Sequence, residues 1–287
     1  LIYSGAWRMI TGGDCGGFMG AFAFGSLLVV GCVVLSLGGM FVVRRLLPPA
    51  SLREHHEVAG YLLSIVGTLY AVLLGLVIVD VQSKYQEAKV IAETEANAVA
   101  DMYLLSMGCG DKVKKSLQGS LAQYVELVIS EWTEPPVGTI DVGSVVPLRD
   151  IWAEMIVYEP VTNKQQALYS TMLTEMGQIA DSRRFRIVTS SSSVSPVLWG
   201  VLIAGASLTI TFTYFFAVES LQAQMLMTVL VAVTISLNVM LVGLFANPYR
   251  GDLRIQPVGF MYDRKMIELT SKMEADIKAR KSGAESH

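Results

Sequence analysis

The sequence is poor in charge and in histidine, and each shortage excludes a class of protein. Only 16% of the 287 residues are charged, against about 25% in ordinary soluble domains. A net charge of −3 leaves no basic surface, so we expect no nucleic-acid partner. The chain has no glycine-rich phosphate loop and no Ser-His-Asp arrangement, and three histidines are too few for acid–base catalysis. An enzyme is therefore the least favoured class.

Groups that bind metals are few and badly spaced. Cys15, Cys32 and Cys109 show no metal-type spacing, and no disulfide framework is expected from them. His55-His56-Glu57 is the best candidate for a metal, but adjacent histidines point to different faces of a helix. A loop followed by an acidic first helical turn explains this segment better. We predict no metal site, no cofactor and no catalytic residue.

Apolar sequence, in contrast, is abundant, since 52% of the residues are hydrophobic. Four charge-poor runs cover residues 18–43, 58–80, 197–217 and 225–246. Each is near the roughly 20 residues that a helix needs to cross about 30 Å of hydrocarbon. A lone segment in lipid must bond its own backbone groups, so each run predicts a transmembrane helix. Pro48 and Pro49 end the first run, and Pro196 suits the first turn of the third.

The predicted fold class is all-α: a polytopic membrane protein with four transmembrane helices and a helical cytoplasmic domain inserted between spans two and three. We divide the chain into an N-terminal segment (1–17), transmembrane helices one and two (18–80), the cytoplasmic domain (81–195), transmembrane helices three and four (196–248) and a cytoplasmic tail (249–287). A short hairpin, 219–224, joins spans three and four.

The inserted domain opens with a heptad pattern. Core positions of the heptads alternate steps of four and three along Val81, Tyr85, Ala88, Ala92, Glu95, Val99 and Met102. No glycine or proline interrupts this stretch, so span two is predicted to continue as one helix to about Ser106. Further helices are expected over 112–131, over 148–158 and over 163–188, the last with Thr162 as N-cap. The tail repeats the pattern over 262–281.

Basic residues near the ends of the spans predict the orientation. The first loop carries Arg44, Arg45 and Arg53, and the hairpin 219–224 carries none. The other side carries Arg8, Lys84, Lys89, Arg183, Arg184, Arg186, Arg250, Arg254, Arg264 and Lys265. Because cytoplasmic loops are enriched in Lys and Arg, we expect both termini and the central domain in the cytoplasm.

Three polar residues stand out against the apolar pattern. Asp80 lies where span two leaves the membrane, and is interpreted either as part of an ion entrance or as an interfacial charge that sets helix depth. Asn238 needs a partner in mid-membrane and marks a helix contact or a pore wall. Glu95 occupies a heptad core position, which is costly unless it is paired. The returning helix offers partners for it, namely Arg183, Arg184 or Arg186.

A second polar pattern repeats every four residues. Glu93, Asn97 and Asp101 share one helix face. Such a face would ring a vestibule in a symmetric oligomer, although a solvated helix face is the favoured interpretation.

Several motifs together resemble one family. They are Arg53–Gly60, Gly67–Gly75, Lys84–Ala88, Glu93–Ala98, Glu159-Pro160, Leu168-Tyr169, Asp181–Arg184, Pro196–Trp199, Thr209–Tyr214, Asn247–Asp252 and Pro257. Over residues 20 to 265 the chain resembles the bestrophin-like family of bacterial membrane proteins, a domain of unknown function. The resemblance marks Glu57, Tyr70, Asn97, Asn247, Pro248 and Asp252 as motif residues.

The resemblance to bestrophins proper is more distant. It implies an oligomeric anion-conducting channel with four spans in each subunit. The acidic run that holds calcium in animal bestrophins is missing, since Arg250-Gly251-Asp252 carries a single carboxylate. We therefore do not carry over calcium gating or pore residues.

Two functions are weighed for a homo-oligomer in a bacterial inner membrane. The first is an ion channel of bestrophin-like type. The alternative is a non-conducting scaffold or accessory subunit of a larger assembly with other membrane proteins, which the heptad-bearing helix and the amphipathic tail would suit. A transporter would want broken helices in mid-span, and none of the spans has an internal proline.

Overall fold

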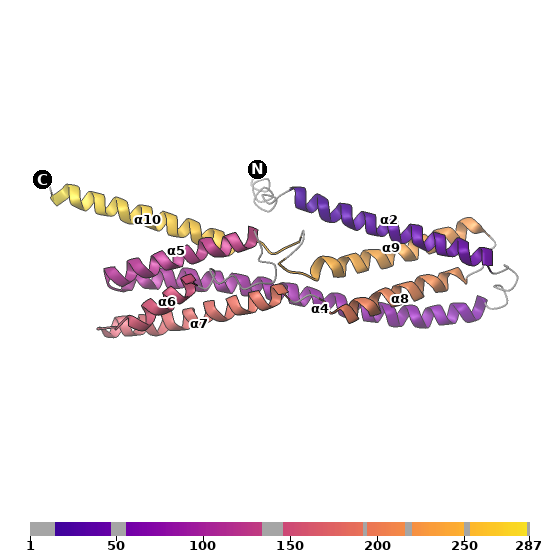
Figure 1. Cartoon of the computed structure of the whole chain (residues 1–287), viewed down its shortest axis with the longest axis horizontal. Helices are drawn as coiled ribbons and strands as arrows, with labels where there is room; N and C mark the ends of the chain where they lie inside the picture. Colours follow the sequence, from indigo (N-terminus) through magenta and orange to yellow (C-terminus); the bar gives the residue numbers. More distant parts are fainter. Residues whose placement is uncertain are drawn as a thin grey trace, which may run out of the picture. The chain divides into compact units, whose positions relative to one another are not determined.

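The computed structural model describes residues 15–46, 56–133, 146–191, 194–215, 220–249 and 253–285, and every regular element in these ranges is helical. In chain order the elements are α2 (Cys15–Leu46), α4 (His56–Leu105), a 3₁₀ turn (Ser106–Gly108), α5 (Asp111–Thr133), α6 (Val146–Val157), α7 (Asn163–Ser191), α8 (Pro196–Tyr214), α9 (Leu221–Phe245) and α10 (Val258–Glu285) (Figure 1). The predicted all-α class is confirmed.

Helix α4 has the length that the heptad pattern predicts. It runs without interruption over 50 residues and ends at Leu105. The 3₁₀ turn that follows is closed by a bond from the Cys109 N–H to the Ser106 carbonyl at 3.0 Å. The predicted seam is also confirmed, because six of its seven positions are buried and Tyr85 is half-buried. Local propensity and a regular apolar period are sufficient to specify this helix.

The helices form two units. The first comprises residues 1–86 and 193–254, and the second comprises residues 87–192 and 255–287. The first unit contains α2, α8, α9 and the first part of α4, and its core is built on Met40, Tyr70, Leu202, Tyr214 and Val242.

The first unit is apolar outside as well as inside. Its exposed side chains include Leu35 at 77%, Leu69 at 67% and Val197 at 75%. Over the described residues, four helices are long and apolar enough to cross a membrane, within Gly25–Leu46, Gly60–Gly108, Pro196–Tyr214 and Leu221–Phe245. Apolar surface on this scale is covered by lipid or by other copies rather than by water.

Caps define where α8 and α9 begin. The Ser195 hydroxyl accepts a bond from the Val197 N–H, and Pro196 occupies the first turn of α8 as predicted. Helix α9 begins earlier than the sequence suggested, so the prediction that the hairpin extends to residue 224 was wrong. Ser220 caps the helix by accepting from the Ala223 N–H at 3.4 Å. The Gln224 side-chain amide donates to the Tyr214 carbonyl at 3.3 Å, which pairs the N–H end of a polar side chain that otherwise favours a loop.

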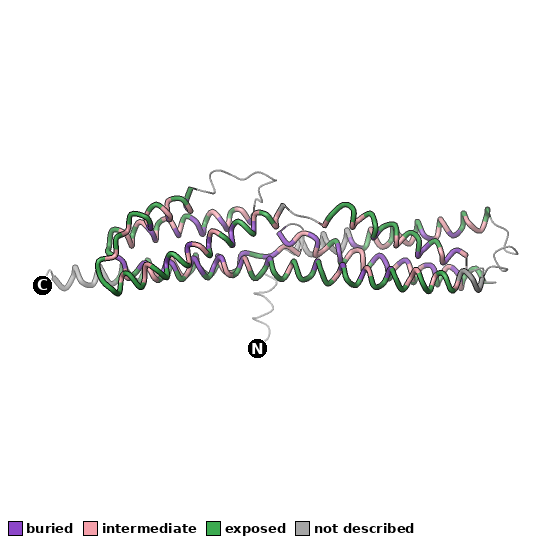
Figure 2. The backbone as a smooth tube through the Cα atoms, turned by 90° about the horizontal axis from the view of Figure 1, so that it is seen from below, coloured by how far each residue is buried: buried purple, intermediate pink, exposed green. Residues whose placement is uncertain are grey.

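The second unit contains the remainder of α4 with α5, α6, α7 and α10. Its core includes the long unbranched side chains of Met102, Met155, Met172 and Met176, together with Leu117, Leu121, Tyr124 and Phe260. Figure 2 shows buried positions recurring along the helices between exposed ones, as amphipathic packing requires.

The predicted N-cap of α7 is confirmed. The Thr162 hydroxyl accepts from the Gln165 N–H at 3.2 Å, and the Gln165 side chain accepts in return from the Val161 and Thr162 N–H groups. This reciprocal arrangement is a capping box.

Gly259 allows α10 to lie close to α4. A Cβ on Gly259 would stand 2.7 Å from the Ala96 Cβ, which has no rotamer that could move away. We therefore expect Gly259→Ala to lower the free energy of unfolding by about 1–3 kcal/mol. Gly177→Ala is the control, because a Cβ there meets nothing within 4 Å and alanine favours a helix. Thermal unfolding of the purified full-length chain measures both, and equal midpoints would contradict the prediction.

Candidate functional site

Helix α4 presents an exposed apolar face that ends at a charge. Its large side chains are between 57% and 74% exposed, and we call them the α4 stripe: Tyr61, Ile65, Leu69, Val72, Leu76 and Val79. Asp80 follows directly and lies four residues after Leu76, so it continues this face. The Asp80 carboxylate accepts a bond from the Lys84 ammonium at 2.8 Å, and both side chains are more than half exposed. An ion pair therefore stands at one end of an apolar surface.

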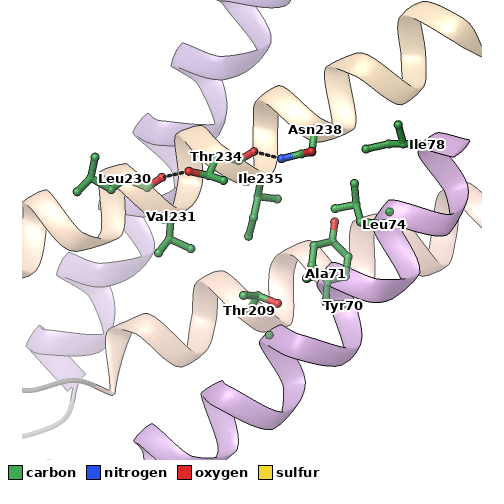
Figure 3. Close-up of a pocket in the computed structure, with 12 residues that line it drawn as sticks. Tyr70, Ala71, Leu74, Ile78, Thr209, Leu230, Val231, Thr234, Ile235 and Asn238 are labelled. Atoms are coloured by element: carbon green, nitrogen blue, oxygen red, sulfur yellow. Dashed lines mark hydrogen bonds between the residues drawn. The ribbon is translucent and has the colours of Figure 1, made fainter. Parts of the chain in front are cut away.

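Asn238 lies in a different place, at a groove between α4, α8 and α9. The groove has a volume of about 410 Å³. It is lined by Gly67, Tyr70, Ala71, Leu74, Gly75, Ile78, Thr209, Leu230, Val231, Thr234, Ile235 and Asn238, and we call it the Asn238 groove (Figure 3). Most of these side chains are apolar, so polar contacts are confined to a few positions.

The polar groups of the Asn238 groove bond to the helices themselves. The Asn238 amide donates to the Thr234 carbonyl and the Thr234 hydroxyl to the Leu230 carbonyl, both at 2.8 Å (Figure 3). The Tyr70 hydroxyl donates to the Leu202 carbonyl at 3.1 Å. The sequence predicted that the Asn238 amide needs a partner in mid-membrane, and the carbonyl of Thr234, one turn earlier on the same helix, is such a partner.

The α4 stripe and the Asn238 groove lie on roughly opposite faces of α4. At about 100° per residue, Leu69, Val72 and Leu76 point about half a turn away from groove residues such as Gly67, Leu74 and Ile78. Asp80 and Asn238 were both predicted as polar membrane sites. The structure separates them, so a pore lined by one face of α4 has room for only one of the two.

Glu95, the third predicted residue, is fully buried and fully paired. Its carboxylate receives two bonds from Arg186, Nε to Oε2 at 2.9 Å and Nη2 to Oε1 at 3.2 Å. The Tyr124 hydroxyl donates a third bond at 2.5 Å. The predicted partner on the returning helix is therefore Arg186, and the exposed Arg184 takes no part in this pair. Bidentate Arg–carboxylate geometry is the strongest that such a pair can adopt.

The pair extends into a network that sequence reasoning missed. Glu131 binds Arg183 at 2.7 Å and Arg186 at 3.1 Å. The Arg186 guanidinium lies 4.7 Å from the centroid of the Trp132 ring, and that of Arg183 lies 5.4 Å from the Tyr124 ring. Two carboxylates and two guanidinium groups balance in charge, which makes burial tolerable. Tyr124 and Glu131 are seven residues apart on α5, and this shared face is the signal that could have found them.

Electrostatics keep the Arg186 side chain of this network charged. Burial acts to lower the pKa of Arg186, but the carboxylates of Glu95 and Glu131 outweigh burial and the pKa is raised. Burial and the Glu95 charge both raise the pKa of the Tyr124 hydroxyl, which stays protonated and able to donate. The network joins α4, α5 and α7, and its role is to hold these helices together rather than to catalyse a reaction.

The family motif residues are spread over the fold. Tyr70 and Pro248 are buried, Asn247 is half-buried, and Asn97 is exposed together with Glu93 and Asp101. Glu57 lies in the first turn of α4, but its side chain, like His55 and Asp252, lies outside the described residues. Within the described ranges, no group of three or more His, Cys, Asp or Glu residues is placed to hold a metal ion.

Comparison with known proteins identifies the family. A model of the bestrophin-like domain matches residues 30–260, which is most of the chain. The chain belongs to the bestrophin-like family. The predicted resemblance is confirmed, and with four apolar helices this bestrophin-like protein is a membrane protein of a channel family. A search of curated proteins found no match.

Solved structures show the same fold at low sequence identity. A bacterial bestrophin homologue from Klebsiella pneumoniae with one mutation has a TM-score of 0.65 and 11% identity, over 85% of this chain and 98% of that chain. A second mutant of the homologue has a TM-score of 0.66 and 11% identity, over 83% of this chain and 97% of that chain. The homologue solved by Zn-SAD phasing has a TM-score of 0.62 and 13% identity, over 84% of this chain and 95% of that chain. The bestrophin-like chain therefore shares their fold.

Proposed function

We propose that this bestrophin-like protein is a homo-oligomeric ion channel in a bacterial inner membrane, in which the α4 stripe of each copy faces the common axis. The α4 stripe carries the proposal, because it is a continuous exposed apolar face that leads directly to the Asp80–Lys84 ion pair. Apolar constrictions gate channels by dewetting, and rings of charged side chains select ions. Around the axis of an oligomer, the α4 stripes would form the apolar constriction and the Asp80–Lys84 pairs would form the charged ring.

The positions of charge support an orientation as part of the same proposal. Basic residues are enriched on the side of the membrane that holds the central region and both termini. We therefore place residues 81–195 and the tail 249–287 in the cytoplasm, with Asp80 at the cytoplasmic end of the pore. The Asn238 groove then faces away from the axis and serves helix contact instead of conduction.

Ion flux into liposomes tests the channel. The purified full-length protein is expected to pass chloride or potassium faster than protein-free vesicles do. Val72→Trp would fill the axis with indole rings and return the flux to the level of protein-free vesicles. Val201→Trp is the matched control, since Val201 is 46% exposed on α8, outside the proposed pore, and its flux should equal that of the wild type.

Each other outcome has a definite meaning. If the two tryptophan variants conduct equally, the α4 stripe does not face the pore. If an oligomer shown by native mass spectrometry conducts nothing, the channel proposal is wrong and the non-conducting scaffold is favoured. A monomer in native membrane extracts would also overturn it.

A further inference from the structure

Asp263 on α10 is a buried acid outside the network described above. Asp263 is only 7% exposed. Its Oδ2 atom is shielded from solvent and has no hydrogen-bond partner in the described part of the chain. Buried carboxylates are normally paired because an isolated charge is costly to remove from water. Asp263 therefore needs a counter-charge, or it needs a proton.

The surrounding groups do not provide a counter-charge. On α4 the charged neighbour is another acid, Asp101, whose charge also contributes to raising the pKa of Glu175 on α7. On α5 Glu126 faces Arg264, with Nη1 and Oε2 3.8 Å apart. On α10 itself Lys265 is exposed, and Lys272 binds Glu268 at 2.6 Å. Among the described residues, no basic group forms an ion pair with Asp263.

The packing around Asp263 ties its charge to the position of α10. One turn earlier, Gly259 lies directly against Ala96 of α4. Phe260 contacts Trp132 of α5, with ring centroids 5.9 Å apart. Because these contacts hold the first turn of α10 in place, hydration of the shielded Oδ2 atom of Asp263 requires α10 to move away.

We propose that Asp263 is a proton-dependent latch, which holds the first turns of α10 against α4 when it is neutral and releases them when it is ionised. Burial, and secondly the charge of Asp101, raise the pKa of Asp263 from 3.8 to about 7 in the docked helix. In a released helix the pKa returns toward its ordinary value. The docked state then holds more protons, so docking is strongest in acid and weakens as the pH rises from about 4 to about 7.

Hydrogen exchange of the full-length protein in detergent tests the latch. After correction for intrinsic exchange rates, the protection of peptides from α10 should fall by up to about tenfold per pH unit up to about pH 7. Above that pH it should level off. Asp263→Asn, which is isosteric and cannot ionise, should abolish this dependence. Asp101→Asn removes the like charge, so levelling off should begin at a lower pH.

Asp276→Asn is the matched control, because Asp276 is an exposed acid on the same helix, and its profile should equal that of the wild type. A wild-type profile in Asp263→Asn would overturn the latch, as would equal loss of protection in α5 and α7. If Asp263→Asn fails to fold, an unshifted profile in Asp101→Asn is the contrary result. Recovery of protection at about pH 8 on adding millimolar Mg²⁺ would make the two acids a cation site and also overturn the proton latch.

Discussion

Arg186→Leu is expected to lower the free energy of unfolding by about 3–5 kcal/mol, because it leaves Glu95 as an uncompensated buried charge. Glu95 is 0% exposed and receives two of its three bonds from Arg186. Glu131 would keep Arg183 as a partner. For a chain of this size, such a loss corresponds to a fall in the unfolding midpoint of about 10 °C.

Arg184→Leu is the matched control for this prediction. Arg184 lies two residues away on the same helix and is exposed, so the same change should shift the midpoint by no more than about 1–2 °C. The double variant Glu95→Leu/Arg186→Leu should be more stable than Arg186→Leu, because no charge is then left unpaired. If Arg186→Leu unfolds at the temperature of Arg184→Leu, the network does not stabilise the second unit.

Opposite shifts in ion preference are expected when either member of the Asp80–Lys84 pair is neutralised. The pair is exposed and locally balanced, so removing one partner leaves a ring of the other charge around the proposed axis. Asp80→Asn should favour anions and Lys84→Gln should favour cations. One charge at about 4 Å in water contributes about 1 kcal/mol, so each permeability ratio should change about fivefold.

Reversal potentials in a salt gradient across a planar bilayer measure this prediction. The two variants should shift the potential in opposite directions from the wild type, and high salt should reduce both shifts by screening. Lys272→Gln is a control, since Lys272 forms a similar exposed pair with Glu268 on α10. If both neutral variants shift the potential in the same direction, or neither shifts it, Asp80 does not line the pore.

The sequence predicted local features well because their physical causes are local. An uninterrupted apolar run specifies a spanning helix, and the four predicted runs fall on α2, α4, α8 and α9. The extent of α4 and the cap at Thr162 follow from helix period and capping chemistry. The start of α9 was misplaced because the amide of Gln224 finds its partner at Tyr214 on α8, a contact between two helices that propensity does not describe.

The ionic network around Glu95 depends on which helices are neighbours, and helix neighbours cannot be predicted from a single sequence. The heptad register marked Glu95 as a buried charge, but only packing selected Arg186 over Arg184 and added Tyr124 and Glu131. Packing also buried Asp263 beside Asp101.

The four apolar spans and the length of α4 were thus determined by the sequence alone, because lipid requires each span to satisfy its own backbone. Only the tertiary structure placed Asn238 in a groove that does not include Asp80 and closed the ionic network, because both depend on contacts between residues far apart in the chain.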